Sequence, residues 1–280
     1  MKKLCILILL CSVLTGYSQD ESQRILLEGE WNFRIDPLDR GIQEAWYSQP
    51  LEERIMLPGS MTENGLGDEV TLNTPWIGSI VDSAYFTEDS YEKYRQPDNI
   101  KIPFWLKPVK YYKGPAWYQK EVKLPGEWAG QEVILHLERC HWESTVFVNE
   151  SQAGKRNSLS VPHEYDLTPY LHAGKNTLSI RIDNRMIVPV GINSHSVSEH
   201  TQSNWNGIVG DIYLEKRPTV QMEHIQIYPD IHTGRVRVKF QVQHAGNQEE
   251  TDEDFLGKVT MKARSFNSEM EHQGTQHQAG

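Results

Sequence analysis

Short runs of alternating apolar and polar residues, separated by turn signals, constrain this chain more than any other feature. A period of two is typical of β-strands with one buried face, because successive side chains point to opposite sides of a sheet. Pro125-Gly126 and Ala153-Gly154 are turn signals between such runs. The pattern predicts an all-β sandwich or barrel. Its apolar positions are Val133, Leu135 and Leu137; Val146 and Val148; Leu178, Ile180 and Ile182; and Ile212 and Leu214.

The composition changes at Arg217-Pro218, which predicts a domain boundary there. All 8 Trp precede it. Beyond it, Arg235–Gln243 alternates as a half-buried strand, and we expect further strands at Ile225–Ile227 and Val259–Ala263. A seven-strand immunoglobulin-like sandwich needs about 100 residues, more than follow Arg217 in this chain. We therefore predict one domain over 19–217 and an incomplete immunoglobulin-like domain over 218–280.

The first 18 residues have the pattern of a secretory signal peptide. Lys2 and Lys3 precede an apolar core, Leu4–Leu14, and small residues precede a cut before Gln19. An N-terminal membrane anchor is the alternative, which the short apolar stretch disfavours. Cleavage would leave Cys140 as the one cysteine, so no internal disulfide is expected. We predict a secreted protein, in the bacterial periplasm, with no membrane association after cleavage.

Charge and composition narrow the function classes. The chain has 28 Lys+Arg against 38 Asp+Glu, a net charge of −10, which disfavours nucleic acid as a partner. The sequence has no P-loop, dinucleotide turn or nucleophile elbow, and we predict no cofactor. His195 and His200 with Glu199 suggest a metal site, but zinc needs three or four ligands, so we predict none. The acidic stretch Glu249–Asp254 is expected to be a solvated loop.

Two glutamates close together in the sequence suggest an acid–base pair. Glu138 and Glu143 flank His141 and Trp142, with Glu138 expected to end one strand and Glu143 to lie in the following turn. The alternative is structural, with Arg139 or Glu143 forming ion pairs across the sandwich. Because 38 acidic residues make such proximity common, the structural interpretation is favoured.

Four segments, in this order and spacing, resemble the N-terminal half of family 2 glycoside hydrolases, the β-galactosidase and β-glucuronidase group. They are Leu27–Phe33, Ile55–Met61, Gly114–Leu171 and Ser203–Ile212. The resemblance covers about residues 25–217 well and the remainder weakly. It implies a jelly-roll sandwich followed by an immunoglobulin-like domain.

The same resemblance implies where the chemistry of the parent enzyme takes place. In the family a third domain, a TIM barrel, carries two glutamates of a retaining pair about 5 Å apart. Such a barrel needs about 250 residues, and this chain has no room for one, so we carry no catalytic residue onto it. The chain is thus expected to be a non-catalytic part of a secreted β-glycosidase, with the barrel as its missing partner.

The segment from Asn193 to Asn206 is the predicted substrate-binding loop. It consists of hydrogen-bonding side chains and Trp205, which suit sugar hydroxyls and a sugar C–H face. The resemblance implies that this loop contacts the terminal sugar of a β-glycoside through an acidic side chain, and Thr201 occupies that position here. Trp205 is expected to be buried beneath the loop; the alternative is a plain polar surface loop. The predicted sugar contacts are His195, His200, Thr201, Gln202 and Asn204.

An aromatic-rich insert, Thr74–Tyr112, is the remaining unusual segment. Packing of a long loop against the sandwich is the favoured interpretation, and a sugar-facing platform is the alternative. For the whole chain, two other functions stay open. One is a stand-alone carbohydrate-binding module, and the other is a structural or adhesion sandwich without a sugar site.

Overall fold

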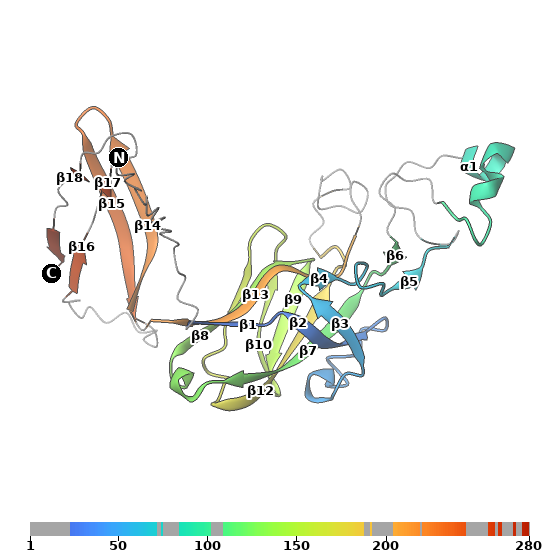
Figure 1. Ribbon diagram of the computed structural model, residues 1–280, viewed down its shortest axis with the longest axis horizontal. Coiled ribbons are helices and arrows are strands. Elements are labelled where there is room, and N and C mark those ends of the chain that lie inside the picture. Colours follow the sequence, from blue (N-terminus) through green and yellow to red (C-terminus); the bar gives the residue numbers. More distant parts are fainter. Residues whose placement is uncertain are drawn as a thin grey trace, which may run out of the picture. The chain divides into compact units, whose positions relative to one another are not determined.

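The computed structural model describes residues 23–71, 74, 84–101, 109–187, 191, 204–218, 220–244, 257–260, 263–264, 271–272 and 276–279. The chain divides into two compact units, Met1–Gln221 and Met222–Gly280. Strands dominate both units (Figure 1), so the predicted all-β class is confirmed. The expected signal peptide and the acidic stretch Glu249–Asp254 lie outside the described residues.

Two antiparallel sheets form the sandwich of the first unit. One sheet, called sheet A here, has the order β1-β13-β8-β11, with β4 also pairing with β13. These strands are β1 (Arg24–Leu26), β13 (Gly207–Arg217), β8 (Glu132–Cys140), β11 (His163–Asp166) and β4 (Gly59–Ser60).

The second sheet, sheet B, has six strands in the order β10-β9-β12-β7-β2-β3. They are β10 (Ser151–Asn157), β9 (Glu143–Val148), β12 (Gly174–Asp183), β7 (Pro115–Leu124), β2 (Gly29–Ile35) and β3 (Glu53–Leu57). The long strands β12 and β7 pair over ten residues, from Gly174 opposite Leu124 to Asp183 opposite Pro115.

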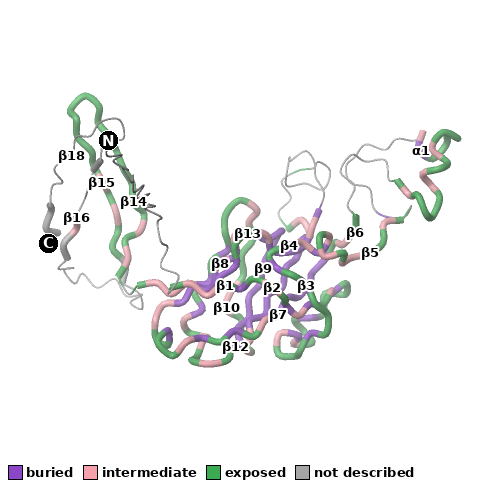
Figure 2. The backbone as a smooth tube through the Cα atoms, in the orientation of Figure 1, coloured by how far each residue is buried: buried purple, intermediate pink, exposed green. Residues whose placement is uncertain are grey.

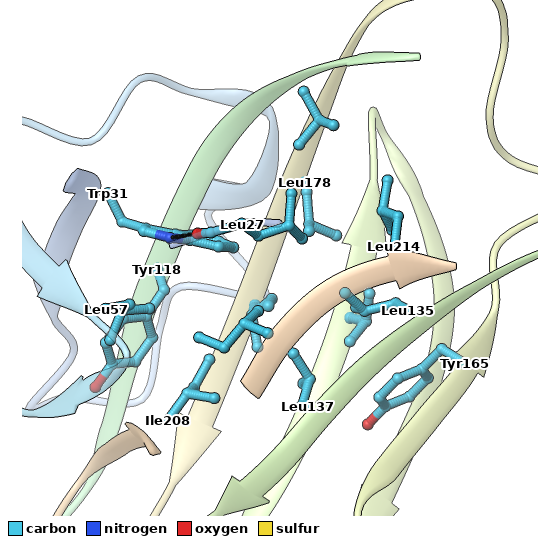
Figure 3. Close-up of a cluster of buried hydrophobic side chains, with 14 of the residues drawn as sticks. Leu27, Trp31, Leu57, Tyr118, Leu135, Leu137, Tyr165, Leu178, Ile208 and Leu214 are labelled. Atoms are coloured by element: carbon cyan, nitrogen blue, oxygen red, sulfur yellow. Dashed lines mark hydrogen bonds between the residues drawn. The ribbon is translucent and has the colours of Figure 1, made fainter. Parts of the chain in front are cut away.

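The core lies between the inner faces of the two sheets. Every apolar position of the predicted alternating runs is buried there, which confirms the strand assignments before Arg217. Figure 3 shows how leucines of sheet A meet Leu178 and Tyr118 of sheet B. Trp31 lies in the same cluster and donates its indole N–H to the Leu27 carbonyl oxygen at 2.8 Å. Burying each large apolar side chain contributes about 1.5–3 kcal/mol.

The outer face of sheet B is covered in part by the chain itself. The segment 36–51, with the 3₁₀ helix η2 (Trp46–Ser48), places Trp46 and Leu51 against Trp117 of β7 and Phe147 of β9. Tyr47 stacks on Phe147 with ring centroids 4.4 Å apart. The central strands of sheet B are therefore buried on both faces.

A buried carboxylate fixes the start of this covering segment. Asp36 accepts hydrogen bonds from the main-chain N–H groups of Arg40 and Gly41, both at 2.8 Å, and from the Trp117 indole N–H at 3.1 Å. A Cβ added to Gly41 would lie 2.2 Å from the Trp117 indole nitrogen, so the close approach requires glycine here.

Short elements complete the first unit. The strand β5 (Asp68–Glu69), just before the insert, pairs with β6 (Lys110–Tyr111) near its end. The insert also contains the helical turn α1 (Ala84–Thr87) and the 3₁₀ helix η3 (Asp89–Tyr94). A further 3₁₀ helix, η4 (Gly126–Trp128), follows β7.

The second unit contains a long hairpin, β14 (Val220–Asp230) with β15 (Arg235–His244), in which β14 starts just before the unit boundary. The predicted strands are present, but the expectation of a half-buried β15 is wrong. Val236 is 59% exposed and Ile227 of β14 is 65% exposed, and Figure 2 shows the hairpin largely exposed. Alternation predicts which side chains share a face, but it does not supply the second layer that would cover them.

The remaining strands of the second unit form two short pairs. β16 (Gly257–Thr260) pairs with β19 (Gln276–Ala279), and β17 (Ala263–Arg264) pairs with β18 (Glu271–His272). The single strand predicted over Val259–Ala263 is thus described as parts of two strands, and Met261 lies outside the described residues.

Candidate functional site

The candidate site lies at the end of the sandwich where β12 ends and β13 begins. Asp183 is the last residue of β12 and Gly207 the first of β13. The chain around these ends carries buried asparagines at 184, 204 and 206. The Asn204 side chain donates from Nδ2 to the main-chain oxygen of Asn184 at 3.0 Å. This bond closes the base of the segment between the two strands.

Asn206 holds three neighbouring segments through its buried side chain. Its Nδ2 donates to the carbonyl oxygens of Gly114 at 2.9 Å and Ile182 at 3.1 Å. Its Oδ1 accepts from the Tyr118 hydroxyl at 2.6 Å. Burial raises the pKa of Tyr118, so this phenol stays protonated and acts as the donor.

Asn184 makes a matching set of bonds to the chain that enters β7. Its Oδ1 accepts from the Gly114 N–H at 2.8 Å, and its Nδ2 donates to the Tyr112 carbonyl oxygen at 2.9 Å. The side chains at 184 and 206 therefore hold Gly114 from both sides, one through its N–H and one through its carbonyl.

Aromatic side chains lie beside this asparagine cluster. Trp205 is partly buried, and its ring lies 5.0 Å from that of His141. Trp142, which follows His141, is buried and donates its main-chain N–H to the Asp183 carbonyl oxygen at 3.0 Å. Trp205 is thus partly buried, with its ring against His141, and residues 192–203 of the loop under which we expect it to pack lie outside the described residues.

An ion-pair network covers the outer side of the same strand end. The buried Arg181 guanidinium contacts Asp39 at 2.7 Å and Asp183 at 2.9 Å, and Arg185 contacts Asp39 at 2.6 Å. Burial alone would raise the pKa of Asp183, but hydrogen bonds from Arg185 hold that pKa below its usual range. The same two arginines lower the pKa of Asp39 against its burial. The carboxylates are thus held charged, and they tie Arg185 to the covering segment.

The structure places one of the five predicted sugar contacts. Asn204 is 8% exposed and anchors the base of the segment through Asn184. His195, His200, Thr201 and Gln202 lie outside the described residues. The sequence analysis did not predict a role for Asn184 or Asn206. The pattern that could have indicated them is one asparagine directly after the β12 strand and another directly before the β13 strand.

The suggested glutamate pair has structural contacts. Glu138 accepts a hydrogen bond from the Asp211 N–H at 2.8 Å, where a bulge interrupts the pairing of β13 with β8. Glu143 is buried and pairs with Lys155 at 2.7 Å and with Arg181 at 3.7 Å. The predicted turn position of Glu143 is wrong, since it is the first residue of β9, and β8 extends past Glu138 to Cys140. Glu143 thus forms ion pairs, but with β10 and β12 of its own sheet B and not across the sandwich as expected.

Aromatic residues of the insert pack on one another where the structure describes them. Tyr85 is buried, and its ring lies 5.0 Å from Phe86 and 6.1 Å from Tyr91. Tyr94 has Lys93 and Lys101 over its ring. These contacts lie within the insert itself, while Tyr112 at its end packs against the core of the sandwich. Trp76, Phe104 and Trp105 lie outside the described residues.

No group of three or more His, Cys, Asp or Glu side chains suited to a metal ion occurs among the described residues. The suggested His195, Glu199 and His200 lie outside them. None of the described helices has the length and apolar character to cross a membrane.

The first unit is an all-β sandwich domain with a polar end, and comparison with known families gives the particular class. Residues 77–218 match the family described as glycosyl hydrolases family 2, sugar binding domain. The chain belongs to this family.

Individual relatives agree with this assignment. A β-glucuronidase from Paenibacillus borealis is 24% identical over 160 residues, which are 56% of this chain and 20% of that protein. A β-galactosidase from Thermoanaerobacter pseudethanolicus is 27% identical over 126 residues, which are 42% of this chain and 17% of that protein. This chain thus spans about a fifth of the length of these relatives.

A solved structure has the same fold. The Ruminococcus gnavus β-glucuronidase in complex with D-glucaro 1,5-lactone has a TM-score of 0.57 and 16% sequence identity. The match covers 92% of this chain and 39% of that one.

Proposed function

We propose that this chain is the non-catalytic N-terminal part of a secreted family 2 β-glycosidase and supplies sugar contacts and scaffold to it. One observation carries the proposal: the family match over 77–218 is to a sugar binding domain, and the similar β-glucuronidases and β-galactosidases are several times longer than their matched parts. The partner required for hydrolysis is a barrel domain that carries the catalytic glutamates.

The proposed ligand is the terminal sugar of a β-glycoside, bound at the end of the sandwich formed by β12 and β13. Partly exposed Trp205 and the polar segment before it supply the two kinds of contact that sugars need, an aromatic face and hydrogen-bonding groups. His195, His200, Thr201, Gln202 and Asn204 are the proposed contacts. The ion pairs of Asp39 and Asp183 with Arg185 support the entry to this segment.

The proposed location is the periplasm. It rests on the basic start at Lys2 and Lys3 and the apolar core Leu4–Leu14. N-terminal sequencing of the protein from a periplasmic fraction should give Gln19 as the first residue. A cytoplasmic protein that keeps its N-terminus would contradict this part of the proposal.

The function is tested by binding and by complementation. The purified chain is titrated with phenyl β-D-glucuronide and phenyl β-D-galactoside, and ligand-detected NMR reports contact. We expect weak binding by the chain alone and turnover only when a family 2 barrel domain is supplied. Tight binding without any barrel would favour a stand-alone carbohydrate-binding module. No binding and no complementation would overturn the proposal.

A further inference from the structure

Gly114 connects the insert to the candidate site through its main-chain hydrogen bonds. It immediately precedes β7, so it lies at the exit of the aromatic-rich insert. Both of its main-chain polar groups are bound by side chains: its N–H by Asn184 and its carbonyl oxygen by Asn206. Buried main-chain groups outside a sheet ladder need such partners, and here both partners are asparagines.

The two asparagines flank the predicted sugar-binding segment. Asn184 directly follows β12 and Asn206 directly precedes β13, so they stand at the two ends of the segment. The Asn204–Asn184 bond joins these ends to each other at 3.0 Å. Buried amide side chains therefore fix three pieces of chain to one another. These are the end of β12, the start of β13 and the exit of the insert.

We propose that Asn184 and Asn206 are positioning residues, which hold the exit of the insert against the end of β12 and the start of β13 and so set the place where a glycan contacts this end of the sandwich. The inference rests on the proposed sugar-binding function and deepens it. Neither side chain needs to touch the glycan. Within the described part of the chain, both side chains hydrogen-bond to protein atoms, including the Tyr112 and Ile182 carbonyl oxygens and the Tyr118 hydroxyl.

The chain offers a matched control at the other end of β12. Asn176 is also buried, and its Nδ2 donates to the carbonyl oxygens of His172 at 2.7 Å and Gly174 at 3.1 Å. It therefore makes the same kind of bonds as Asn184. At about 3.3 Å per residue, the strand places the two asparagines more than 20 Å apart. Loss of Asn176 should destabilise the sandwich without disturbing the candidate site.

The experiment compares Asn184→Ala, Asn206→Ala and Asn176→Ala in the full 280-residue chain, well below the lowest Tm. Hydrogen exchange is followed by mass spectrometry in peptides covering 109–118 and 204–212. Affinity is measured with phenyl β-D-glucuronide and phenyl β-D-galactoside. We expect the two site variants to exchange faster in both peptides and to bind the recognised glycoside about tenfold more weakly. Asn176→Ala should lower the Tm comparably and change neither readout.

Three other outcomes have definite meanings for the role of the asparagines. If the control variant changes exchange and affinity as much as the site variants, the role of the asparagines is general stability and the inference is wrong. If the unsubstituted chain binds neither glycoside and does not complement a barrel domain, the proposed function fails. Hydrogen exchange in the two peptides then decides by itself whether Asn184 and Asn206 couple the segments. Should an alanine variant not fold, Asn184→Asp keeps the acceptor for Gly114 and removes the donor to Tyr112, and it must then accelerate exchange in the same two peptides.

Discussion

Ser144 Oγ lies 2.6 Å from Nδ1 of His163, and this contact joins β9 of sheet B to β11 of sheet A inside the core. The Tyr165 hydroxyl lies 2.6 Å from the same Ser144 Oγ. Nε2 of His163 lies 3.0 Å from the Ser158 carbonyl oxygen, which can only accept a hydrogen bond. A neutral imidazole protonated on Nε2 therefore satisfies the whole network, with Nδ1 accepting from the serine hydroxyl.

This network predicts that the sandwich loses stability in mild acid. Burial lowers the pKa of His163 below its ordinary 6.5, and Arg156 adds to the effect, while the bond to Ser158 opposes it. The unfolded chain then binds more protons than the folded chain below about pH 6.5, so the free energy of unfolding falls as the pH drops through that value. Urea unfolding at pH 8, 6.5 and 5 should show this decrease.

The control for that prediction is His163→Gln, which cannot be protonated in this range. Its free energy of unfolding should depend less on pH than that of the unsubstituted chain. The pKa values of Asp39 and Asp183 are lowered from the ordinary 3.8, so these carboxylates become protonated only below the pH range of this test. Equal pH dependence of the two proteins between pH 5 and 8 would contradict the assignment.

Gly41→Ala should destabilise the first unit. The added methyl would meet the Trp117 indole, which is packed beneath the covering segment and cannot move freely. Overpacking of this kind costs about 1–3 kcal/mol. Gly126→Ala is the matched control, because nothing lies within 4 Å of its added Cβ. Thermal unfolding that ranks the two variants equally would show that the covering segment yields easily.

The second unit should be the first target of protease. The β14–β15 hairpin exposes apolar side chains such as Ile225 and Val236 together with the trypsin sites Arg235 and Arg237. A two-stranded hairpin is at best marginally stable in water. Limited trypsin digestion followed by mass spectrometry should give early cuts at Arg235 and Arg237, and a lasting core that extends no further than Arg235, because the Arg217–Pro218 bond resists trypsin. Equal lifetimes of the two units would argue that the second unit is a complete domain.

The chain alone should not hydrolyse glycosides. Glu138 accepts from the Asp211 N–H and Glu143 is ion-paired with Lys155, so both carboxylates have structural partners, whereas a retaining pair must be free to act on a bound sugar. Aryl β-galactosides and β-glucuronides should give blank rates with the purified chain and with its Glu138→Gln and Glu143→Gln variants. Turnover that survives removal of contaminating enzymes and falls in either variant would reverse this expectation.

Local patterns in the sequence predicted four strands of the sandwich, β8, β9, β12 and β13, but not shorter ones such as β1 and β11 and not their arrangement. The alternation around Leu135 and Ile180 predicted β8 and β12 together with their buried faces. It could not predict that β13 lies between β1 and β8, because that pairing joins residues almost two hundred positions apart, such as Arg24 and Glu215. The covering segment 36–51 was missed as well, since its contacts with Trp117 leave no periodic signal.

The candidate site was predicted only in part for a related reason. Polar residues around Trp205 suggested sugar contacts by their chemistry. Asn184 and Asn206 have the same chemistry, but their role depends on burial and on partners such as Gly114, about seventy and ninety residues away in the sequence. A hydrogen-bonding side chain therefore does not reveal from sequence whether it faces a ligand or its own main chain.

The covering segment 36–51 limits how a carbohydrate can approach sheet B. A long polysaccharide lying along the strands would need an open, flat surface, and Trp46 and Tyr47 already occupy the middle of that surface. The polar end beyond Asp183 is reached along the strand axis instead. A glycan docking there would meet the domain tip first, an orientation suited to the end of a sugar chain rather than to its interior.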